Sequence, residues 1–320
     1  MSGPMTEILN LAVPFFALIL LGWLAAKLFH HGEAGLAWLN TFVVWFALPA
    51  LIFLVMAAAP FEKLIDWPFL SLTGGVTMAM FVIMMLASRF LLRTPFVEAV
   101  LQGTSASYGN VGYMGLPLAV AFFGPEAAVP AALVFCFDCA LQFIVTAFLV
   151  TLGTAHGEDA HWGDVLWRLV RQVVGHPFIV ATVLGGLASW LAFHPAGPLG
   201  TVLDMLMKSA APVALFALGV TVGLRRLALT GREFPMLVAI KLVIQPIMAL
   251  LVVGQLAGLD PLWLHVAVMM AALPTASNAF VLASQYGIYR EGASSAVIVT
   301  TVLSALTIPP LIYALKAGWL

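Results

Sequence analysis

The sequence has very little charge for its length. Only 8% of its 320 residues are Asp, Glu, Lys or Arg, whereas 63% are hydrophobic, and the mean hydropathy is +1.09. A soluble domain uses about 25% charged residues to cover its surface, so a water-soluble globular fold is excluded. The formal net charge of -1 comes with no basic patch interleaved with aromatic residues, which argues against nucleic-acid binding.

Cysteine and catalytic motifs are also scarce. The two cysteines, Cys136 and Cys139, lie in one apolar stretch and supply too few ligands for a zinc site. We interpret them as small apolar residues of a packed helix, with a redox or metal-binding pair as the alternative. The sequence lacks His-Glu-x-x-His and Gly-x-Ser-x-Gly motifs, and Asp138 is the only acidic residue deep in a predicted helix. We therefore predict no catalysis, no bound metal and no cofactor.

Long hydrophobic runs are abundant. Charge-free runs of about 17 to 25 residues match the hydrocarbon thickness of a bilayer, and they recur from end to end of the chain. The first run lacks a basic leader and exceeds the length of a signal core, so we interpret it as a span rather than a signal peptide. With Gly and Pro as punctuation, ten transmembrane helices are predicted. Their ranges are 7–28, 36–58, 67–92, 97–123, 127–153, 176–194, 199–224, 233–257, 261–286 and 292–316.

The placement of basic residues predicts the orientation in the membrane. Nine of them fall in the odd-numbered connections between the ten spans, whereas only Lys63 and Lys316 fall on the opposite side. By the positive-inside rule the odd connections face the cytoplasm, and both termini lie outside. The nine are Lys27, Arg89, Arg93, Arg168, Arg171, Arg225, Arg226, Arg232 and Arg290.

The two halves of the chain resemble each other. Pro14 and Pro177 precede a Gly-x-Leu sequence by the same interval, and Pro49 and Pro212 follow them by the same interval. We predict two five-span repeats, residues 1–153 and 176–320, joined by a cytoplasmic linker at 154–175 with an amphipathic surface turn at 162–173. An odd number of spans per repeat inverts the second repeat relative to the first. The predicted fold class is an all-α integral membrane protein of ten helices in two inverted repeats.

Polar and helix-breaking residues interrupt the fourth and ninth predicted spans, at 105–117 and 274–278. Unwound backbone at membrane depth persists only where protein or a water-filled cavity satisfies its amides, and matching interruptions in two halves mark transporter binding sites. The second half of a broken helix presents free N–H groups and a positive dipole end, which stabilise an anion. Kinks in ordinary packed helices are the alternative. The predicted substrate-binding residues are Asn110, Val111, Gly112, Gly115, Pro117, Pro274, Thr275, Ala276, Ser277 and Asn278.

Ionisable residues inside spans indicate function. Asp138 is our first candidate for a proton carrier or a ligand of a coupling cation, and a structural pair with Lys241 is equally open. Lys241 either counters a substrate carboxylate or snorkels to the interface. Lys208 follows Asp204 by four residues, which favours a local salt bridge over a role in substrate binding or ion coupling. His265 is interpreted as an interfacial residue.

Small and hydroxyl residues in the spans have structural interpretations. Gly219 and Gly223 are spaced for close helix approach. Serine and threonine hydroxyls either bond across helices, which we favour, or line a sodium site. They are Ser71, Thr73, Ser294, Ser295, Thr300, Thr301, Ser304 and Thr307.

The segment Asn110-Val-Gly-Tyr-Met-Gly-Leu-Pro117 resembles the Asn-x-Gly-x-x-Gly-x-Pro signature of the auxin efflux carrier family, which includes plant PIN carriers and bacterial malonate and organic-acid carriers. The likeness spans nearly the whole chain. Other matching segments are 48–53, 211–219, 241–246, 274–280 and 300–309.

The resemblance implies ten spans in two inverted repeats (NhaA/PIN-like), with broken helices 4 and 9 crossing at their prolines. It implies a scaffold of helices 1, 2, 6 and 7, often dimeric, and a mobile transport domain of helices 3–5 and 8–10, with substrate between them. It further implies an elevator-like displacement and carboxylate substrates. For a bacterial member we expect a homodimer in the inner membrane.

We therefore predict a secondary transporter of small organic anions, such as malonate-like, malate-like or auxin-like acids. Coupling to H⁺, to Na⁺ or to neither stays open, as does the direction of transport. One alternative is a sodium-coupled symporter of the bile-acid type, a distant relative of the fold. The other is an ion channel, since broken helices also build selectivity filters.

Overall fold

The computed structural model describes residues 4–29, 32–64, 66–154, 167, 171, 174–225, 227, 231–256 and 258–319. All regular elements in these ranges are helices, and one isolated β-bridge joins Gly109 and Thr275. The predicted all-α class is therefore confirmed. The surface turn predicted at 162–173 falls outside the described residues, apart from 167 and 171.

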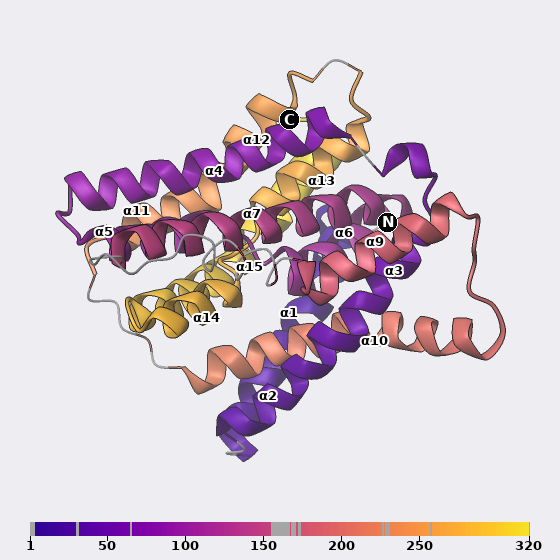
Figure 1. Ribbon diagram of the computed structural model, residues 1–320, viewed down its shortest axis with the longest axis horizontal. Helices are drawn as coiled ribbons and strands as arrows, with labels where there is room; N and C mark the ends of the chain where they lie inside the picture. The colour runs from indigo at the N-terminus through magenta and orange to yellow at the C-terminus, as the bar shows by residue number, and fades with distance from the viewer. Residues whose placement is uncertain are drawn as a thin grey trace.

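The helices follow one another along the whole chain (Figure 1). The α-helices are α1 (Pro4–Phe29), α2 (Gly32–Phe42), α3 (Leu48–Ala58), α4 (Trp67–Phe90), α5 (Phe96–Ser107), α6 (Leu116–Phe123), α7 (Ala128–Thr154), α9 (Pro177–Trp190), α10 (Gly197–Leu224), α11 (Phe234–Ala239), α12 (Gln245–Val253), α13 (Pro261–Ala271), α14 (Ser277–Tyr286) and α15 (Arg290–Lys316). Short π-helices are η1 (Val43–Ala47), η3 (Val111–Gly115) and η5 (Ile240–Ile244), and 3₁₀ turns are η2 (Phe61–Lys63) and η4 (Pro125–Ala127).

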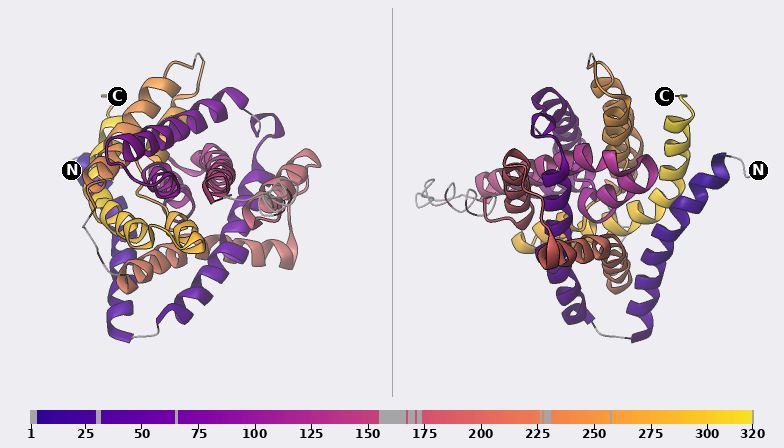
Figure 2. Two further views of the ribbon diagram at one scale, coloured as in Figure 1. Left: turned by 60° about the vertical axis from the view of Figure 1, so that its left-hand side comes forward. Right: turned by 90° about the vertical axis from the view of Figure 1, so that its right-hand side faces the viewer.

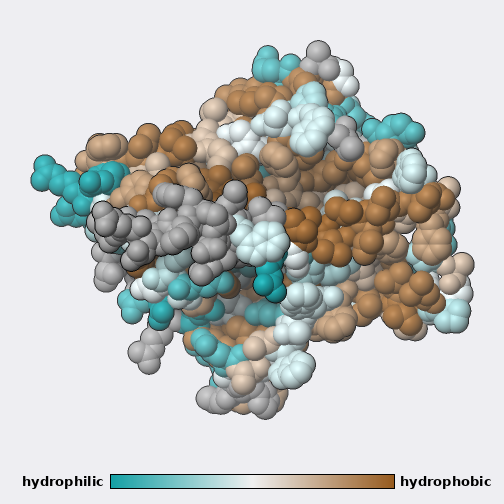
Figure 3. Space-filling view, in the orientation of Figure 1, coloured by the Kyte–Doolittle hydropathy of each residue, from teal (hydrophilic) through white to brown (hydrophobic). Residues whose placement is uncertain are grey.

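Length and composition make much of this chain suited to a bilayer. Among the described residues, seven helices are long and apolar enough to cross a membrane. They are Asn10–Phe29, Gly32–Ala58, Trp67–Phe90, Pro125–Thr154, Gly197–Leu224, Phe234–Val253 and Arg290–Lys316, and three shorter apolar helices are Val111–Phe123, Pro177–Trp190 and Pro261–Ala271. Large apolar side chains such as Trp38 and Leu306 lie on the outside, 79% and 73% exposed. Apolar residues also cover broad areas of the face shown in Figure 3, as expected of a surface in contact with lipid.

A proline follows each π-helix by two residues. Pro49 follows η1, Pro117 follows η3 and Pro246 follows η5. A proline has no N–H to donate, and its ring clashes with the carbonyl one turn earlier, so a helix that continues through it must widen or bend locally. A π-turn is one such widening, and π-turns often lie at functional sites. Two of these three turns, η3 and η5, lie beside the candidate site described below.

Helices α1, α2, α3, α9 and α10 contact one another, with α1 along α10 and α3 along α9. The contacts are close because glycines of one helix lie directly against the backbone of the next. A Cβ added to Gly219 on α10, for example, would overlap the carbonyl oxygen of Ile19 on α1. One added to Gly185 would lie 2.6 Å from the Cβ of Met56. The close approach expected from Gly219 and Gly223 is therefore confirmed.

The remaining helices pack as a second group. Helices α4, α5 and α7 lie side by side in Figure 1, and α12 contacts both α4 and α13. Helix α14 contacts α15, and both contact α5. The two groups meet where α3 and α9 contact α7 and where α10 contacts η3. The candidate site lies near this boundary.

Candidate substrate site

Two helix interruptions meet through their backbones. Helix α5 ends at Ser107 and η3 begins at Val111, while α13 ends at Ala271 and α14 begins at Ser277. The amide of Asn110 donates to the carbonyl of Pro274 at 2.8 Å, and the amide of Ala276 donates to the carbonyl of Tyr108 at 2.9 Å. Each extended segment thus satisfies backbone groups of the other in the protein interior.

Thr275 fixes this pairing from both sides. Its hydroxyl donates to the carbonyl of Ser105 at 2.8 Å, and its amide donates to the hydroxyl of Thr300 at 2.9 Å. Thr300 therefore serves as a cross-helix hydrogen-bond acceptor, in line with the structural interpretation of the hydroxyl residues. Gly115 provides the close packing on the other side: a Cβ there would lie 2.6 Å from the sulfur of Met270.

The N-termini of η3 and α14 face a shared pocket with an empty volume of about 310 Å³. Neither terminus has a side-chain cap. The first N–H groups of a helix lack intrahelical acceptors, and the helix dipole places partial positive charge at this end. Two such ends beside one pocket favour a negatively charged group there.

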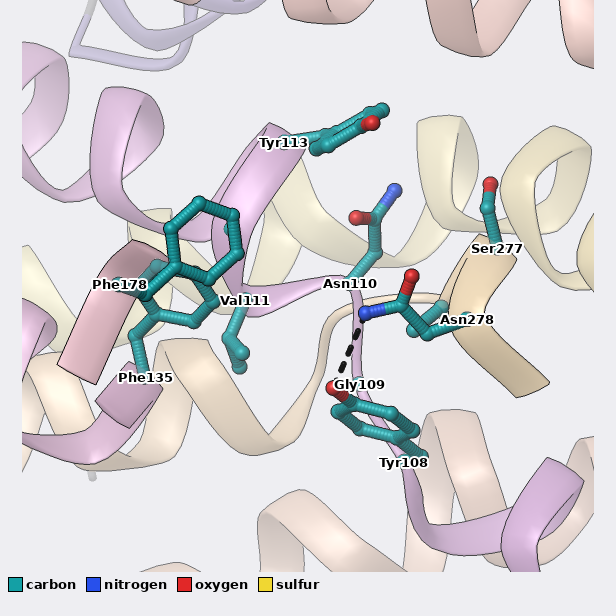
Figure 4. Close-up of a pocket in the computed structure, with 11 residues that line it drawn as sticks. Tyr108, Gly109, Asn110, Val111, Tyr113, Phe135, Phe178, Ser277 and Asn278 are labelled. Carbon is teal, nitrogen blue, oxygen red and sulfur yellow. Dashed lines mark hydrogen bonds between the residues drawn. The ribbon is translucent and has the colours of Figure 1, made fainter. Parts of the chain in front are cut away.

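Unpartnered polar side chains also line the pocket. Asn110 is 4% exposed, yet within the described part of the chain neither its Nδ2 nor the buried hydroxyl of Ser277 has a hydrogen-bond partner. Asn278 donates from Nδ2 to the hydroxyl of Tyr108 at 3.2 Å, as the dashed line in Figure 4 shows. Buried donors normally find partners, so the free amide and hydroxyl are suited to a ligand.

Aromatic side chains form the opposite wall. Figure 4 shows the rings of Phe135 and Phe178 across from the amides of Asn110 and Asn278. The ring centroids of the two phenylalanines are 4.7 Å apart, and Phe178 comes from α9, in the other helix group. The pocket therefore pairs a polar, donor-rich side with an apolar side.

Tyr113 and Gly112 shape the rest of the pocket. The hydroxyl of Tyr113 donates to Oδ1 of Asn40 on α2 at 3.1 Å, which joins η3 to the first helix group. A Cβ on Gly112 would lie 2.9 Å from the ring of Phe135, so only glycine leaves this gap open.

The C-terminal ends of the same interrupted helices are satisfied by a different pair of side chains. Lys241 is fully buried, and its ammonium donates to the carbonyl of Ala271 at 2.9 Å and to Oε1 of Gln245 at 2.6 Å. Gln245 in turn donates from Nε2 to the carbonyl of Ser107 at 3.1 Å. A lysine and its i+4 glutamine from η5 and α12 thus cap the negative dipole ends of α5 and α13.

Asp138 lies in a separate cavity with an empty volume of about 240 Å³. Thr77 donates to its Oδ2 at 3.1 Å, whereas Oδ1 is buried without a partner. The cavity also contains Thr73 and Ala271. Among the described residues Asp138 and Lys241 form no direct ion pair, because the ammonium of Lys241 hydrogen-bonds elsewhere.

Six of the ten residues predicted to bind substrate line the pocket: Asn110, Val111, Gly112, Ala276, Ser277 and Asn278. The other four support the crossing, with Pro274 and Thr275 in the backbone pairing, Gly115 in close packing and Pro117 in the first turn of α6. Lys208 is not among the pocket residues; it is 72% exposed and paired with Asp204 at 2.5 Å. The predicted local salt bridge is confirmed.

Several residues of this region were not predicted from the sequence. Tyr113 stands within the quoted motif and Tyr108 two residues before it, and the i+4 spacing of Gln245 from the candidate Lys241 was a usable signal. Phe135 and Phe178 gave no signal, because a phenylalanine in an apolar helix is most often core or lipid-facing. Their role follows only from the packing of α7 against α9.

These features define a class: an integral membrane protein with several apolar helices and a pocket between them. Comparison with known proteins makes the class specific. The family described as "Membrane transport protein" matches residues 7–312, and the chain belongs to this family. The protein is therefore a membrane transporter rather than an enzyme, and the resemblance to auxin efflux carriers is confirmed.

Relatives of known name agree with this assignment. A protein of Rhizobium meliloti named "Putative malonate transporter" is 41% identical over 314 residues, which cover 98% of each chain. The "Uncharacterized transporter YfdV" of Escherichia coli K12 is 23% identical over 308 residues, covering 94% of this chain and 95% of the relative. A rice protein named "Probable auxin efflux carrier component 5b" is 33% identical over 151 residues, covering 43% and 40% of the two chains.

Proposed function

We propose that the protein is a secondary transporter that moves small organic anions across the bacterial inner membrane by alternating access. The observation that carries this proposal is the convergence of two uncapped helix N-termini on a pocket with a free Asn110 amide and a free Ser277 hydroxyl. Two positive dipole ends and neutral donors suit a carboxylate, which accepts several hydrogen bonds at once.

Malonate is the first substrate to test. The extensively similar relative from Rhizobium meliloti carries that substrate in its name. No Lys or Arg is among the described residues that line the pocket, so the carboxylate would be held by N–H groups, amides and the hydroxyl. Malate-like and auxin-like acids share the carboxylate, and the rings of Phe135 and Phe178 offer a surface for an apolar body.

The proposed topology has ten spans in two inverted five-helix repeats, residues 1–153 and 176–320. Seven long apolar helices and three shorter ones support this count. In this arrangement α5 with η3 and α6 forms a broken fourth span, and α13 with α14 forms a broken ninth span. Their antiparallel pairing at Gly109 and Thr275 supports a crossing related by inversion. The charge asymmetry supports an orientation with both termini outside.

The proposed mechanism is an elevator-like movement of a transport domain against a scaffold. The scaffold would contain α1, α2, α3, α9 and α10 and would form a homodimer; the other helices would move. The packing of the helices in two groups supports this division. The pocket lies between the groups, since Phe178 comes from the scaffold and Asn110 and Asn278 come from the transport domain.

The contacts of Lys241 bear on ion coupling. In sodium-coupled carriers with broken helices, unwound carbonyls and helix C-termini coordinate the cation. Here the ammonium of Lys241 already bonds the carbonyl of Ala271, which makes a coupling Na⁺ unnecessary at that position. Asp138, with one free oxygen in its own cavity, is the proposed proton carrier. Sodium coupling is the second candidate, because the hydroxyls of Thr73 and Thr77 beside Asp138 could also serve a cation.

Uptake of labelled malonate into proteoliposomes tests the proposal. We expect saturable uptake that persists when choline replaces sodium, and Asp138→Asn should flatten the dependence of uptake on pH.

Asn110→Ala should weaken substrate binding by roughly 10- to 100-fold, the effect of losing a hydrogen bond to a charged group. Asn10→Ala on the exposed surface of α1 is the matched control. Normal malonate binding by the Asn110→Ala protein would remove this pocket as the site.

A further inference from the structure

A large groove lies outside the proposed substrate pocket, between α1, α10 and α15. Its empty volume is about 1110 Å³. Helices α1 and α15 contact each other, and Figure 2 shows them side by side in indigo and yellow. Leu20 and Val302 line this groove and are 56% and 60% exposed, so it is open to the surrounding lipid.

The groove has the length of one bilayer leaflet. Along α1 its lining extends from Phe16 to Lys27, which at 1.5 Å per residue is about 16 Å. The hydrocarbon core of a bilayer is about 30 Å thick, so this is close to half of it. Apart from Lys27, Arg225 and Thr301, the lining side chains are aliphatic or aromatic.

Two cations lie at one end of the groove. Lys27 is in the last turn of α1 and is exposed, and Arg225 directly follows α10. Neither forms a salt bridge within the described part of the chain. The guanidinium of Arg225 lies 3.2 Å from the ring centroid of Phe280, and its buried Nε has no hydrogen-bond partner among the described residues.

Arg225 keeps its charge in this position. Burial lowers its pKa to about 10, and the negative charge of Glu33 acts in the opposite direction. The guanidinium is therefore protonated at neutral pH. An apolar groove of one leaflet's length with two cations at one end matches a molecule with acyl chains and an anionic head.

We propose that this groove binds one anionic phospholipid, with its phosphate between Lys27 and Arg225 and an acyl chain along α15. Basic pockets between transmembrane helices are established sites for anionic headgroups, and long basic side chains reach the headgroup level from helix ends. The lipid bridges the two helix groups at this site. One consequence rests on the proposed function: lipid occupancy of the groove sets how easily α15 moves past α1 during transport.

Native mass spectrometry of the detergent-solubilised protein, offered equal amounts of phosphatidylglycerol and phosphatidylcholine, tests the site. We expect one retained phosphatidylglycerol in preference to phosphatidylcholine. Each of Lys27→Gln and Arg225→Gln should reduce this preference about fivefold, the contribution of one basic side chain beside an anionic lipid. Arg89→Gln, at the exposed end of α4, is the matched charge control.

A second pair of variants tests the groove without changing charge. Val302→Trp fills it, whereas Leu306→Trp adds the same ring one turn further along α15, outside the lining. Loss of the bound lipid in the first and its retention in the second support the site. Equal binding of both lipids by the wild-type protein, or equal lipid retention in the two tryptophan variants, overturns it. The measurement involves no malonate, so its outcome is independent of the substrate assignment.

Discussion

At the scale of the residue, the positive and negative ends of the interrupted helices face different partners at the candidate site. The N-termini of η3 and α14 face the pocket, while Lys241 and Gln245 hold the C-terminal carbonyls of Ala271 and Ser107. A buried ammonium is costly unless its hydrogen bonds are made, so the position of Lys241 depends on those carbonyls. Lysine here acts on the protein's own backbone, and in the proposed function substrate recognition is left to neutral donors.

Replacing Lys241 tests this role. Lys241→Ala should lower stability by roughly 1–3 kcal/mol, because the carbonyl of Ala271 and the side chain of Gln245 lose their donor. Sodium should restore part of the loss by occupying the vacated position, seen as a higher Tm in NaCl than in choline chloride. Lys208→Ala, which breaks only an exposed pair, should change stability by at most about 1 kcal/mol. Equal Tm values in the two salts would contradict the carbonyl site.

Gly112 controls the width of the pocket. Gly112→Ala places a methyl group 2.9 Å from the ring of Phe135, so the ring must shift into the pocket or the methyl group must fill the gap. We expect weaker malonate binding, by roughly tenfold, from a folded protein, measured by thermal shift at increasing malonate. Gly75→Ala has open space around its added Cβ and serves as the control. Undiminished binding by Gly112→Ala would show that the gap is not used.

At the scale of the element, glycine contacts determine how closely helices pack, and prolines determine where they widen. Helix α1 meets α10 through Gly22, Gly219 and Gly223, each of which faces backbone of the other helix. Such contacts tolerate no side chain, so α1 and α10 are held in one register. The π-turns before Pro117 and Pro246 widen the helices locally in the group that is proposed to move, beside the pocket and Lys241.

The register of α1 on α10 can be tested at Gly219. Gly219→Ala should destabilise the protein by about 1–3 kcal/mol, because its Cβ overlaps the carbonyl of Ile19 and overpacking is relieved only by moving a helix. Gly186→Ala on α9 meets only the end of Leu64 at 3.8 Å and should be neutral or stabilising. Thermal unfolding in detergent measures both. Identical Tm values for the two variants would contradict the close packing.

At the scale of the whole molecule, the features predicted from the sequence are those that depend on hydrophobicity and on local helix-breaking residues. Apolar runs predicted the helical membrane class, and the Asn110 and Asn278 motifs predicted residues that line one pocket although 168 positions separate them. Repeat pattern alone did not predict which helices of the other group would face that pocket. Tertiary packing brings Phe178 into the pocket and Asn40 to the hydroxyl of Tyr113, and such packing leaves no periodic signal in a chain that is apolar almost throughout.

The proposed movement between the two helix groups can be tested at one contact. The sulfur of Cys136 on α7 lies 2.7 Å from the hydroxyl oxygen of Thr182 on α9, so the elements face each other across the proposed moving boundary. Thr182→Cys should form a disulfide with native Cys136 on oxidation, because the two side chains already meet. Joined in this way, α7 cannot slide along α9.

We therefore expect oxidation to lower the malonate flux of the Thr182→Cys protein at least about tenfold, and dithiothreitol to restore that flux. The control is Thr182→Cys with Cys136→Ser, in which Cys139 is the remaining native thiol, buried on the same helix. This control should keep its flux under oxidant. Mass spectrometry of the intact protein verifies the bond. Full flux through a protein shown to be crosslinked would mean that α7 and α9 stay together during transport, and the elevator-like division of the helices would be wrong.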